Sequence, residues 1–568
     1  MQRAFLEEFV KKEFKLEDNF LFGPPEIKSH GHLSTNAAFA LAKIKKISPM
    51  AAGELVRDLV SKKFTNEFSK IDVIAPGFVN FWFSDESIGR QFKNIYKNRE
   101  KLGKPESSVL KYNKTKKVIV EYPSPNIGKP MHVGHMRSTI IGDAIANIHD
   151  FLGYKVIRWN YIGDWGTQFG KLIYAYKRWG NKVDLRKNPI TSLLGLYIKF
   201  HNEAKKDESL DKEGQTEFKK LEEGNLENRR LWQLFTKESL KELNKIFKTL
   251  DIKFDVTLGE SFYEEKLKPL INEFLEKGIA MRSEGSLIIN LNKFNLQPAL
   301  IQKSDGASLY LTREIANLEY RVKKYKPAKI LYVVGNEQSL HFEQLFAIAK
   351  ILGLDESELS HIKHGLVLGE DGKKLSTREG RIVVFEDLIK KSIELAYLAA
   401  DTKNPKLPQK DKKKISEIVG IGALKYNDLS QNRNSNIGFD WDKMLSFEGN
   451  SGPYIQYTYV RMKNILNKAR KMKLFNVKQL SREIDQELIL KLFNFGDVVE
   501  RAGEENMPNY IAQYLYDLAQ IMNKFYEAEP IIKSEKEIRD ARLALVEASA
   551  KTLKNGLNLL GIKTLEKM

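Results

Sequence analysis

"KVIVEYPSPNIGKPMHVGHMRSTIIGDAIANIHDFLGYKVIRWNYIG" (residues 117–163) carries the pattern that decides the fold of this chain. It begins with an apolar run at 117–122, which is typical of a buried strand. A turn with proline and glycine follows, and then one helix face carries the apolar residues Ile141, Ile145, Ile148 and Leu152. Gly153 ends this helix, and 155–163 supplies a second strand rich in β-branched and aromatic residues. Strand, helix and strand in this order predict a parallel βαβ unit.

The sequence on either side of this unit predicts an α/β core with an insertion. Charged helical patterns dominate from about 176 to 300, with a strand pair near 278–290, and we interpret this range as an insertion. Strand and helix patterns alternate again from 307 to 369, which completes a doubly wound parallel sheet. We therefore expect a Rossmann-type α/β domain at 111–400.

The two ends of the chain predict separate modules. Residues 1–110 mix helical and strand patterns, as a small α+β module would. After 401–414 the strand patterns stop, and four long helix candidates follow at 453–472, 486–505, 509–529 and 539–557. We expect these to form an all-α helical bundle within 401–568.

The composition is that of a soluble globular protein, with 42% hydrophobic and 29% charged residues in 568 positions. No apolar run is long enough to span a bilayer, and the N-terminus lacks the apolar stretch of a signal peptide, so we expect a cytoplasmic protein without a membrane partner. The absence of cysteine excludes disulfides, a cysteine nucleophile and thiolate zinc sites. We expect no structural zinc.

The net charge of +19 indicates a polyanionic partner. Lysines cluster at 43–46, 114–117 and 410–414, and such clusters release counterions when they contact a phosphate backbone. A lysine-rich proteome would give the same charge without such a partner. We favour nucleic acid over that alternative.

His132 and His135 lie on either side of Gly134 at the predicted start of the helix. They are metal ligands, buried structural histidines or donors to a phosphate. Zinc would require a third ligand, and none follows at a convincing spacing. A core role is weak for a Pro/Gly turn at the carboxyl end of a strand, where doubly wound sheets bind ligands. We therefore favour an anion site at a helix N-terminus.

A second candidate site is the loop "GEDGKKLSTREG" at 369–380, which follows a predicted strand. It is either a charged surface loop or a clamp for the pyrophosphate of a nucleotide. The second interpretation rests on four donors between glycines: Lys373, Lys374, Ser376 and Arg378. Two phosphate sites on one sheet would imply nucleotidyl transfer.

The segments "HVGH" and "KKLST" resemble the HIGH and KMSKS signatures of class I aminoacyl-tRNA synthetases. Other segments resemble the arginyl-tRNA synthetases, over essentially the whole chain: "EYPSPNIGKP", "NYIGDWGTQFG", "SDGASLYLTRE", "GNEQSLH" and "GNSGPYIQYTYVR". This resemblance implies that L-arginine is activated with ATP and Mg²⁺ and transferred to the 2′-hydroxyl of the terminal adenosine of tRNA(Arg). It also implies a monomer whose N-terminal module binds the tRNA elbow and whose bundle binds the anticodon stem.

The resemblance assigns roles to individual residues. The α-phosphate and adenosine are bound by His132, Gly134 and His135, and the pyrophosphate by Lys374 with its loop neighbours Lys373, Ser376 and Arg378. The family's arginine contacts map onto Glu121, Asn126, Tyr310, Glu314 and Gln338. The loop at 163–170 is expected to support the active site rather than react.

Two positions depart from the family pattern. Glu314 stands where aspartate is common, and Thr377 stands at the second lysine of KMSKS. We expect Lys129 to supply the missing charge as a catalytic residue, from a turn that Pro130 stiffens. Arg378 is the competing donor, and a solvated turn lysine is the third possibility.

Two other functions remain open at this point. A nucleotidyltransferase of the same superfamily also carries His-x-Gly-His, but its chemistry needs no large helical domain. A tRNA-binding paralogue without activity is opposed by the presence of His132, His135 and Lys374. Four tyrosines of the bundle occur at helical spacing, for which we favour core positions over stacking on anticodon bases: Tyr454, Tyr457, Tyr510 and Tyr514.

Overall fold

The computed structural model describes residues 3–17, 20, 22–25, 27–304, 309–369, 383–469, 475–528 and 530–568. Its central sheet contains five parallel strands in the order β12-β11-β5-β6-β7. The strands are β5 (Lys117–Glu121), β6 (Lys155–Ile162), β7 (Val256–Gly259), β11 (Lys329–Gly335) and β12 (Glu358–His364). β5, the first of these strands along the chain, lies in the middle of the sheet. The order in which strands are added therefore reverses between β5 and β11, as in the predicted doubly wound fold.

The predicted βαβ unit forms around helix α6 (Val133–Phe151), and β5 pairs with β6 from Lys117 and Lys155 onward. Gly142 lets α6 approach the sheet closely, because a Cβ at this position would lie 2.4 Å from Cγ of Tyr122. Gly153 has φ +95°, a left-handed conformation that favours glycine and ends the helix where predicted. The close fit holds the N-terminus of α6 at the carboxyl end of β5.

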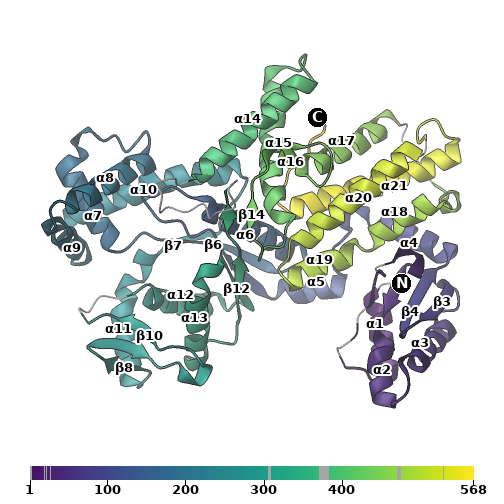
Figure 1. Cartoon of the computed structure of the whole chain (residues 1–568), viewed down its shortest axis with the longest axis horizontal. Coiled ribbons are helices and arrows are strands. Elements are labelled where there is room, and N and C mark those ends of the chain that lie inside the picture. Colours follow the sequence, from purple (N-terminus) through teal and green to yellow (C-terminus); the bar gives the residue numbers. More distant parts are fainter. Residues whose placement is uncertain are drawn as a thin grey trace.

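The N-terminal region is an α+β module, as predicted (Figure 1, lower right). Its sheet has the order β1-β2-β4-β3 and is antiparallel throughout. The strands are β1 (Phe22–Gly23), β2 (Leu33–Thr35), β3 (Phe68–Ile74) and β4 (Phe78–Phe83). The helices are α1 (Arg3–Phe14), α2 (Ala37–Lys45) and α3 (Pro49–Lys63), and α4 (Asp85–Lys97) and α5 (Ser107–Lys114) lead to the central sheet.

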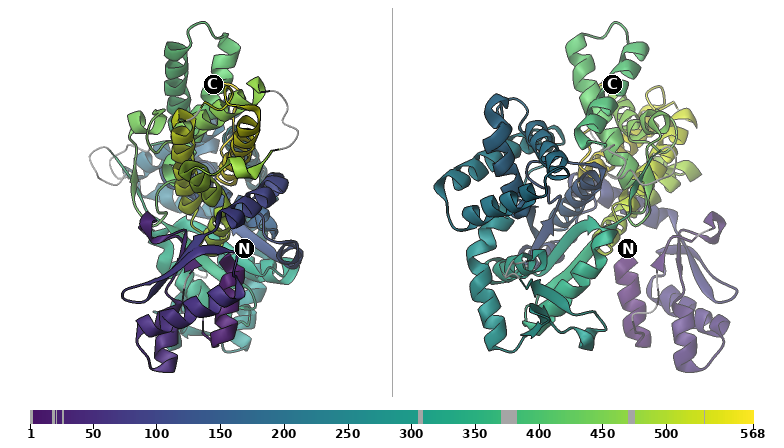
Figure 2. Two further views of the ribbon diagram at one scale, coloured as in Figure 1. Left: turned by 90° about the vertical axis from the view of Figure 1, so that its right-hand side faces the viewer. Right: turned by 60° about the vertical axis from the view of Figure 1, so that its left-hand side comes forward.

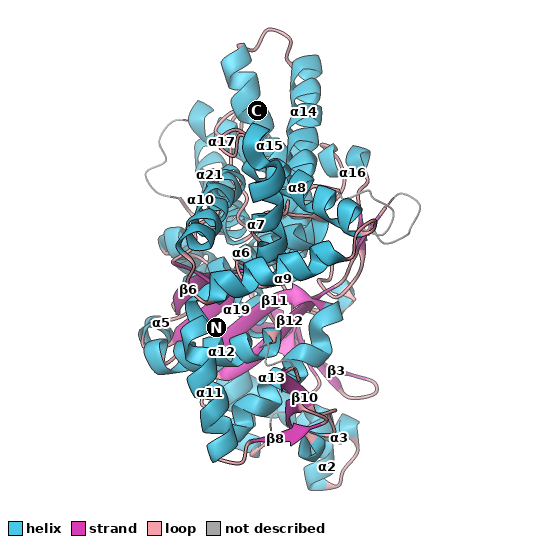
Figure 3. Ribbon diagram, turned by 90° about the vertical axis from the view of Figure 1, so that its left-hand side faces the viewer, coloured by secondary structure: helices cyan, strands magenta, loops and turns pink. Residues whose placement is uncertain are grey.

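The range predicted as an insertion contains a strand of the central sheet, β7, which separates two groups of elements. The first group is helical, with α7 (Thr167–Trp179), α8 (Pro189–Ala204), α9 (Ser209–Glu222) and α10 (Leu226–Thr249). The second has α11 (Glu264–Glu276) and an antiparallel sheet of β8 (Ala280–Ser283), β9 (Ser286–Ile289) and β10 (Ala299–Gln302). The predicted strand pair corresponds to β8 and β9. In Figure 1 the first group lies at the upper left and the second at the lower left, and Figure 3 shows the central strands between them.

After β10 the chain returns to the central sheet through α12 (Tyr310–Tyr325), and α13 (Ser339–Ile351) connects β11 to β12. Beyond the sheet, α14 (Phe385–Lys403) and α15 (Gln409–Leu429) form a hairpin that projects from the molecule (Figure 2, green, top of both views). None of the helices in the described residues combines the length and apolarity that a membrane crossing requires.

The C-terminal region is helical, with two departures from prediction. The helices are α16 (Trp441–Leu445), α17 (Gly452–Lys468), α18 (Glu483–Phe493), α19 (Phe495–Glu504), α20 (Asn509–Ala528) and α21 (Lys536–Leu559). The candidate at 486–505 is broken at Asn494, and the bend buries the ring of Phe495 beside Tyr514. A short strand, β14 (Ile437–Gly438), follows 414 and pairs with β13 (Val367–Leu368), a contact that local periodicity does not show.

The bundle tyrosines differ in burial. Tyr514 is buried and its hydroxyl donates to the Lys491 carbonyl at 2.7 Å, which confirms a core position. Tyr454 and Tyr510 are half-buried. Tyr457 is 43% exposed, so the core prediction is wrong there: its position on α17 faces outward.

A buried ion pair ties α6 to the C-terminal helices. Arg137 of α6 and Asp428 of α15 have fully buried side chains, with Nη2 and Oδ1 2.9 Å apart. Nη1 of Arg137 also donates to the Ser435 carbonyl at 2.8 Å. The helix that begins at the two histidines is therefore anchored on α15.

Candidate active site

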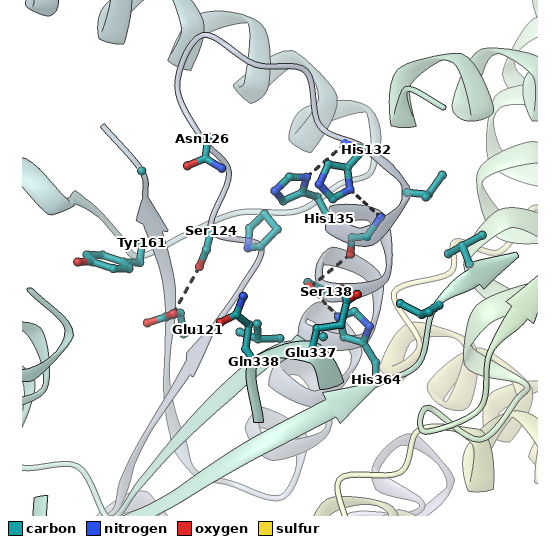
Figure 4. Close-up of a pocket in the computed structure, with 18 of the residues that line it drawn as sticks. Glu121, Ser124, Asn126, His132, His135, Ser138, Tyr161, Glu337, Gln338 and His364 are labelled. Carbon is teal, nitrogen blue, oxygen red and sulfur yellow. Dashed lines mark hydrogen bonds between the residues drawn. The ribbon is translucent and has the colours of Figure 1, made fainter. Parts of the chain in front are cut away.

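A cavity of about 870 Å³ opens at the carboxyl ends of all five central strands (Figure 4). Each strand contributes a lining residue at or just after its end: Glu121, Gly163, Glu260, Gly335 and His364. This is the position where doubly wound sheets bind ligands. We call the side with His132, His135, Ser138 and His364 the histidine end, and the side with Glu121, Tyr161 and Glu260 the carboxylate end.

At the histidine end, the two imidazoles form the N-terminal cap of α6. Nδ1 of His132 accepts a hydrogen bond from the Gly134 amide at 3.0 Å, and Nδ1 of His135 accepts one from the His132 amide at 3.2 Å. A Cβ at Gly134 would lie 2.9 Å from the His132 ring, so a larger residue there would displace the capping imidazole. An Nδ1 that accepts carries no proton, so each neutral ring has its proton on Nε2. Each ring therefore has a donor on Nε2.

Burial and the neighbouring imidazoles of His132 and His364 lower the pKa of His135 to about 3. The pKa of His364 is about 4, chiefly because of its burial. Its Nδ1 lies 3.1 Å from the Gly365 carbonyl, which only accepts, so Nδ1 donates. Nε2 then accepts from the Ser138 hydroxyl at 2.8 Å. Both histidines are thus neutral at physiological pH.

At the carboxylate end, Glu121 is already paired. It is buried, its Oε2 accepts from Nη2 of Arg321, and its Oε1 accepts from the Ser124 hydroxyl at 3.4 Å. The Arg321 guanidinium is fully buried, with Cζ 4.5 Å from the centre of the Trp159 ring. Glu121 therefore lines the cavity with its charge compensated by Arg321, which is not a lining residue.

Two further carboxylates are less compensated. Glu314 is buried behind the wall, and neither of its carboxylate oxygens makes a hydrogen bond of normal geometry within the described residues, although Tyr310 is near enough to lower its pKa. Burial, and next the charge of Glu121, raise the pKa of Glu314 well above its usual value. Burial also raises the pKa of Glu260 to about 7, against the lowering effect of Arg313. This end is suited to a cation.

The structure brings most of the expected site residues together. Seven line the cavity: Glu121, Asn126, His132, Gly134, His135, Tyr310 and Gln338. Glu314 is not a lining residue, and Lys129 is not either, since its Nζ lies over the Tyr197 ring of α8, 4.9 Å from the ring centre. The loop residues Lys373, Lys374, Ser376, Thr377 and Arg378 lie outside the described residues.

Sequence reasoning missed Glu260, Arg321 and His364. Each follows or lies within an ordinary strand or helix pattern, and no motif marks it. Of the three, His364 at the end of "HIKH" could most easily have been predicted, because it lies next to the end of a predicted strand of the same sheet. Glu260 and Arg321 become visible only once β7 and α12 are placed.

The described residues contain no group of three or more histidine or carboxylate side chains that could hold a metal ion. A divalent metal implied by ATP chemistry thus finds no cage of protein ligands in this part of the chain.

Comparisons with known proteins agree along the whole chain. The family described as "tRNA synthetases class I (R), catalytic domain" matches residues 99–441, "Arginyl tRNA synthetase N terminal domain" matches 2–83, and "DALR anticodon binding domain" matches 455–568. The arginine–tRNA ligase of Clostridium kluyveri is 41% identical over 99% of both chains, and that of Streptococcus suis is 43% identical over 94% of this chain and 93% of its own.

Two solved structures have the same architecture. The Thermus thermophilus arginyl-tRNA synthetase superposes with a TM-score of 0.86 at 25% identity, covering 100% of both chains. The Plasmodium falciparum enzyme superposes with a TM-score of 0.83 at 27% identity, covering 100% of this chain and 98% of its own. On these findings the chain belongs to the arginyl-tRNA synthetase family of class I tRNA synthetases.

Proposed function

We propose that the cavity binds L-arginine at its carboxylate end and ATP at its histidine end, so that the arginine carboxylate attacks the α-phosphorus. As a member of this family, the chain is an ATP-dependent arginine–tRNA ligase, which activates arginine and charges tRNA. The observation that carries the site assignment is the pairing of opposite preferences in one cavity: buried carboxylates at one end and imidazole donors on a helix N-terminus at the other.

The carboxylate end fits a guanidinium in charge and shape. Arg321 is paired with Glu121, whereas burial keeps the pKa values of Glu260 and Glu314 raised despite the nearby arginines, so a cationic ligand would favour their ionised forms. A guanidinium presents a planar fork of donors that matches carboxylates. We assign arginine contacts to Glu121, Asn126, Tyr310, Glu314 and Gln338, and add Glu260.

The histidine end fits a phosphate. His132 and His135 donate from Nε2 to oxygens that gain charge in the transition state, and Gly134 lets the nucleotide approach the backbone. The carboxylate of arginine is already ionised, so attack on ATP needs no general base, and pyrophosphate leaves. We assign pyrophosphate binding to Lys373, Lys374, Ser376 and Arg378, with Lys129 as the additional charge. Mg²⁺ would enter with the ATP phosphates, since the described residues have no cage for it.

The flanking modules are proposed to bind tRNA(Arg), with residues 1–110 on its elbow and 401–568 on its anticodon stem, so that the terminal 2′-hydroxyl receives arginine. Not all the clustered lysines are available to phosphates: Lys117 donates to the Tyr325 carbonyl at 2.9 Å, and Lys412 donates to Asp401 at 2.5 Å. A cytoplasmic monomer remains a prediction.

ATP–pyrophosphate exchange over a panel of amino acids, with and without tRNA, tests this function. We expect exchange with arginine and with no other amino acid of the panel. The family resemblance predicts that this exchange requires bound tRNA. Exchange with no amino acid would favour a non-catalytic tRNA-binding paralogue. Nucleotide transfer to another small molecule would favour a nucleotidyltransferase.

A further inference from the structure

The loop that follows β6 touches both walls of the carboxylate end. On one side, the Gly163 amide donates to the Pro125 carbonyl and the Ile127 amide donates to the Gly163 carbonyl, both at 3.0 Å. Asn126 lies between these two bonds, and a Cβ on Gly163 would lie 2.2 Å from its Oδ1. On the other side, the next residue, Asp164, reaches the segment 259–261.

Asp164 contacts that segment through two hydrogen bonds from Ser261 and a close approach to Gly259. Its Oδ1 accepts from the Ser261 amide at 2.9 Å, and its Oδ2 accepts from the Ser261 hydroxyl at 2.7 Å. At Gly259 the approach is so close that a Cβ would lie 2.2 Å from Oδ2. Glu260 stands between Gly259 and Ser261, so Asp164 is hydrogen-bonded to the residue after it and packs against the residue before it.

Asp164 is itself held in place from outside. It is 4% exposed, and the indole nitrogen of Trp232 on α10 donates to its carbonyl at 2.7 Å. Trp232 also contacts the buried ring of Trp165 edge to face, with ring centres 5.5 Å apart. The contacts of Asp164 with 259–261 are therefore made from a position that Trp232 fixes.

We propose that Asp164 is a positioning residue for arginine recognition, which fixes Glu260 in the cavity wall by holding Gly259 and Ser261. The proposal rests on the proposed function, in which Glu260 contacts the arginine guanidinium. Asp164 itself is not a lining residue of the cavity and acts through Glu260.

The choice of a carboxylate for this task has a physical reason. Two donors from one serine, its amide and its hydroxyl, meet two acceptor oxygens in a fixed geometry, which strengthens both bonds. Asparagine would offer only one oxygen and would turn an NH₂ group toward a second donor. Burial raises the pKa of Asp164, and the two hydrogen bonds from Ser261 oppose that rise because they favour the ionised carboxylate.

The test measures aminoacylation kinetics at saturating tRNA for Asp164→Asn and for the milder Ser261→Ala. We expect both to raise the KM for arginine, Asp164→Asn by roughly 10- to 100-fold, because small displacements of a recognition group have effects of this size. The KM for ATP should stay within about twofold, since the histidine end shares none of these contacts. Glu260→Gln should raise the arginine KM as well.

A double-mutant cycle separates positioning from general structure. If Asp164 acts through Glu260, adding Asp164→Asn to Glu260→Gln produces no further rise in arginine KM. Asp255→Asn is the matched control, because Asp255 accepts from the Arg158 amide at 2.8 Å at the other end of β7. We expect this control to leave both KM values unchanged.

Three results would overturn the proposal: multiplicative losses in the double variant, an unchanged arginine KM in both Asp164→Asn and Ser261→Ala, or an equal rise for ATP. Glu314→Gln distinguishes these from a failure of the proposed function. If Glu314→Gln raises the arginine KM while Asp164→Asn and Ser261→Ala do not, only the positioning role fails. If none of the variants changes it, the arginine site is elsewhere. Should Asp164→Asn not fold, Ser261→Ala carries the same cycle.

Discussion

The two ends of the cavity are built in different ways. At the histidine end, the helix cap is formed by contacts within four residues, since His132 and His135 cap the helix that they begin. The carboxylate end is assembled from strands and helices far apart in the chain, and Glu121 depends on Arg321, 200 residues later. In the proposed function, the phosphate-binding histidines therefore depend on a local motif, whereas the arginine-binding carboxylates depend on tertiary structure.

The largest effect is expected where the carboxylate end depends on a distant partner. Arg321→Met leaves Glu121 as a buried charge without its partner, which should destabilise the protein by about 3–5 kcal/mol. Thermal or urea unfolding of the ligand-free enzyme measures this. The double variant Glu121→Gln/Arg321→Met should lose much less, because no buried charge remains. Additive losses would mean that the two residues do not act as a pair.

The histidine end should respond in activity and not in stability. In His135→Asn the amide oxygen replaces Nδ1 as the acceptor for the His132 amide, but the Nε2 donor is lost. We expect kcat for arginine activation to fall roughly 10²- to 10³-fold, the usual effect of one preorganised donor. The unfolding midpoint should change little. Loss of stability with normal kcat would reduce His135 to a helix cap.

Sequence reasoning succeeded where the structure is local, and this follows from the same contrast. Short-range sequence patterns predict the βαβ unit, the histidine pair and the helical C-terminus. The family resemblance, and not a pattern, indicated residues such as Asn126 and Gln338. Glu260, Arg321 and the role of β7 in the sheet depend on which distant segments meet. The break at Asn494 has the same origin, since burial of Phe495 overrides the helical pattern across it.

pH should affect the two ends differently. Because burial raises the pKa of Glu260 to about 7 and that of Glu314 above its usual value, arginine must displace protons at low pH. The KM for arginine should therefore fall about tenfold from about pH 6 to 8, as expected for one carboxyl titrating near 7. The KM for ATP should stay nearly flat, since His135, with a pKa of about 3, is neutral throughout.

The stability of the ligand-free enzyme should fall as pH rises, whereas the affinity for arginine should increase. A carboxyl with a raised pKa binds more protons in the folded state than in the unfolded state, so its contribution to stability is lost as pH rises through the folded pKa. Glu260→Gln should weaken both trends together. A flat arginine KM in the unmodified enzyme would show that these carboxyls are ionised before arginine binds.

The smallest effect concerns a hydroxyl group. Tyr161 lines the cavity and its hydroxyl has no hydrogen-bond partner in the described residues, whereas the Tyr263 hydroxyl, on a ring 6.1 Å away, donates to Asn317 at 2.7 Å. A buried hydroxyl without a partner is costly unless a ligand or water satisfies it. Tyr161→Phe should thus change stability by less than about 0.5 kcal/mol but raise the arginine KM about five- to tenfold, the value of one hydrogen bond. Tyr263→Phe is the matched control: it should lose about 1 kcal/mol of stability and leave the arginine KM nearly unchanged. If the two variants exchange these effects, the Tyr161 hydroxyl serves the fold, and the carboxylate end recognises arginine through its carboxylates and amides alone.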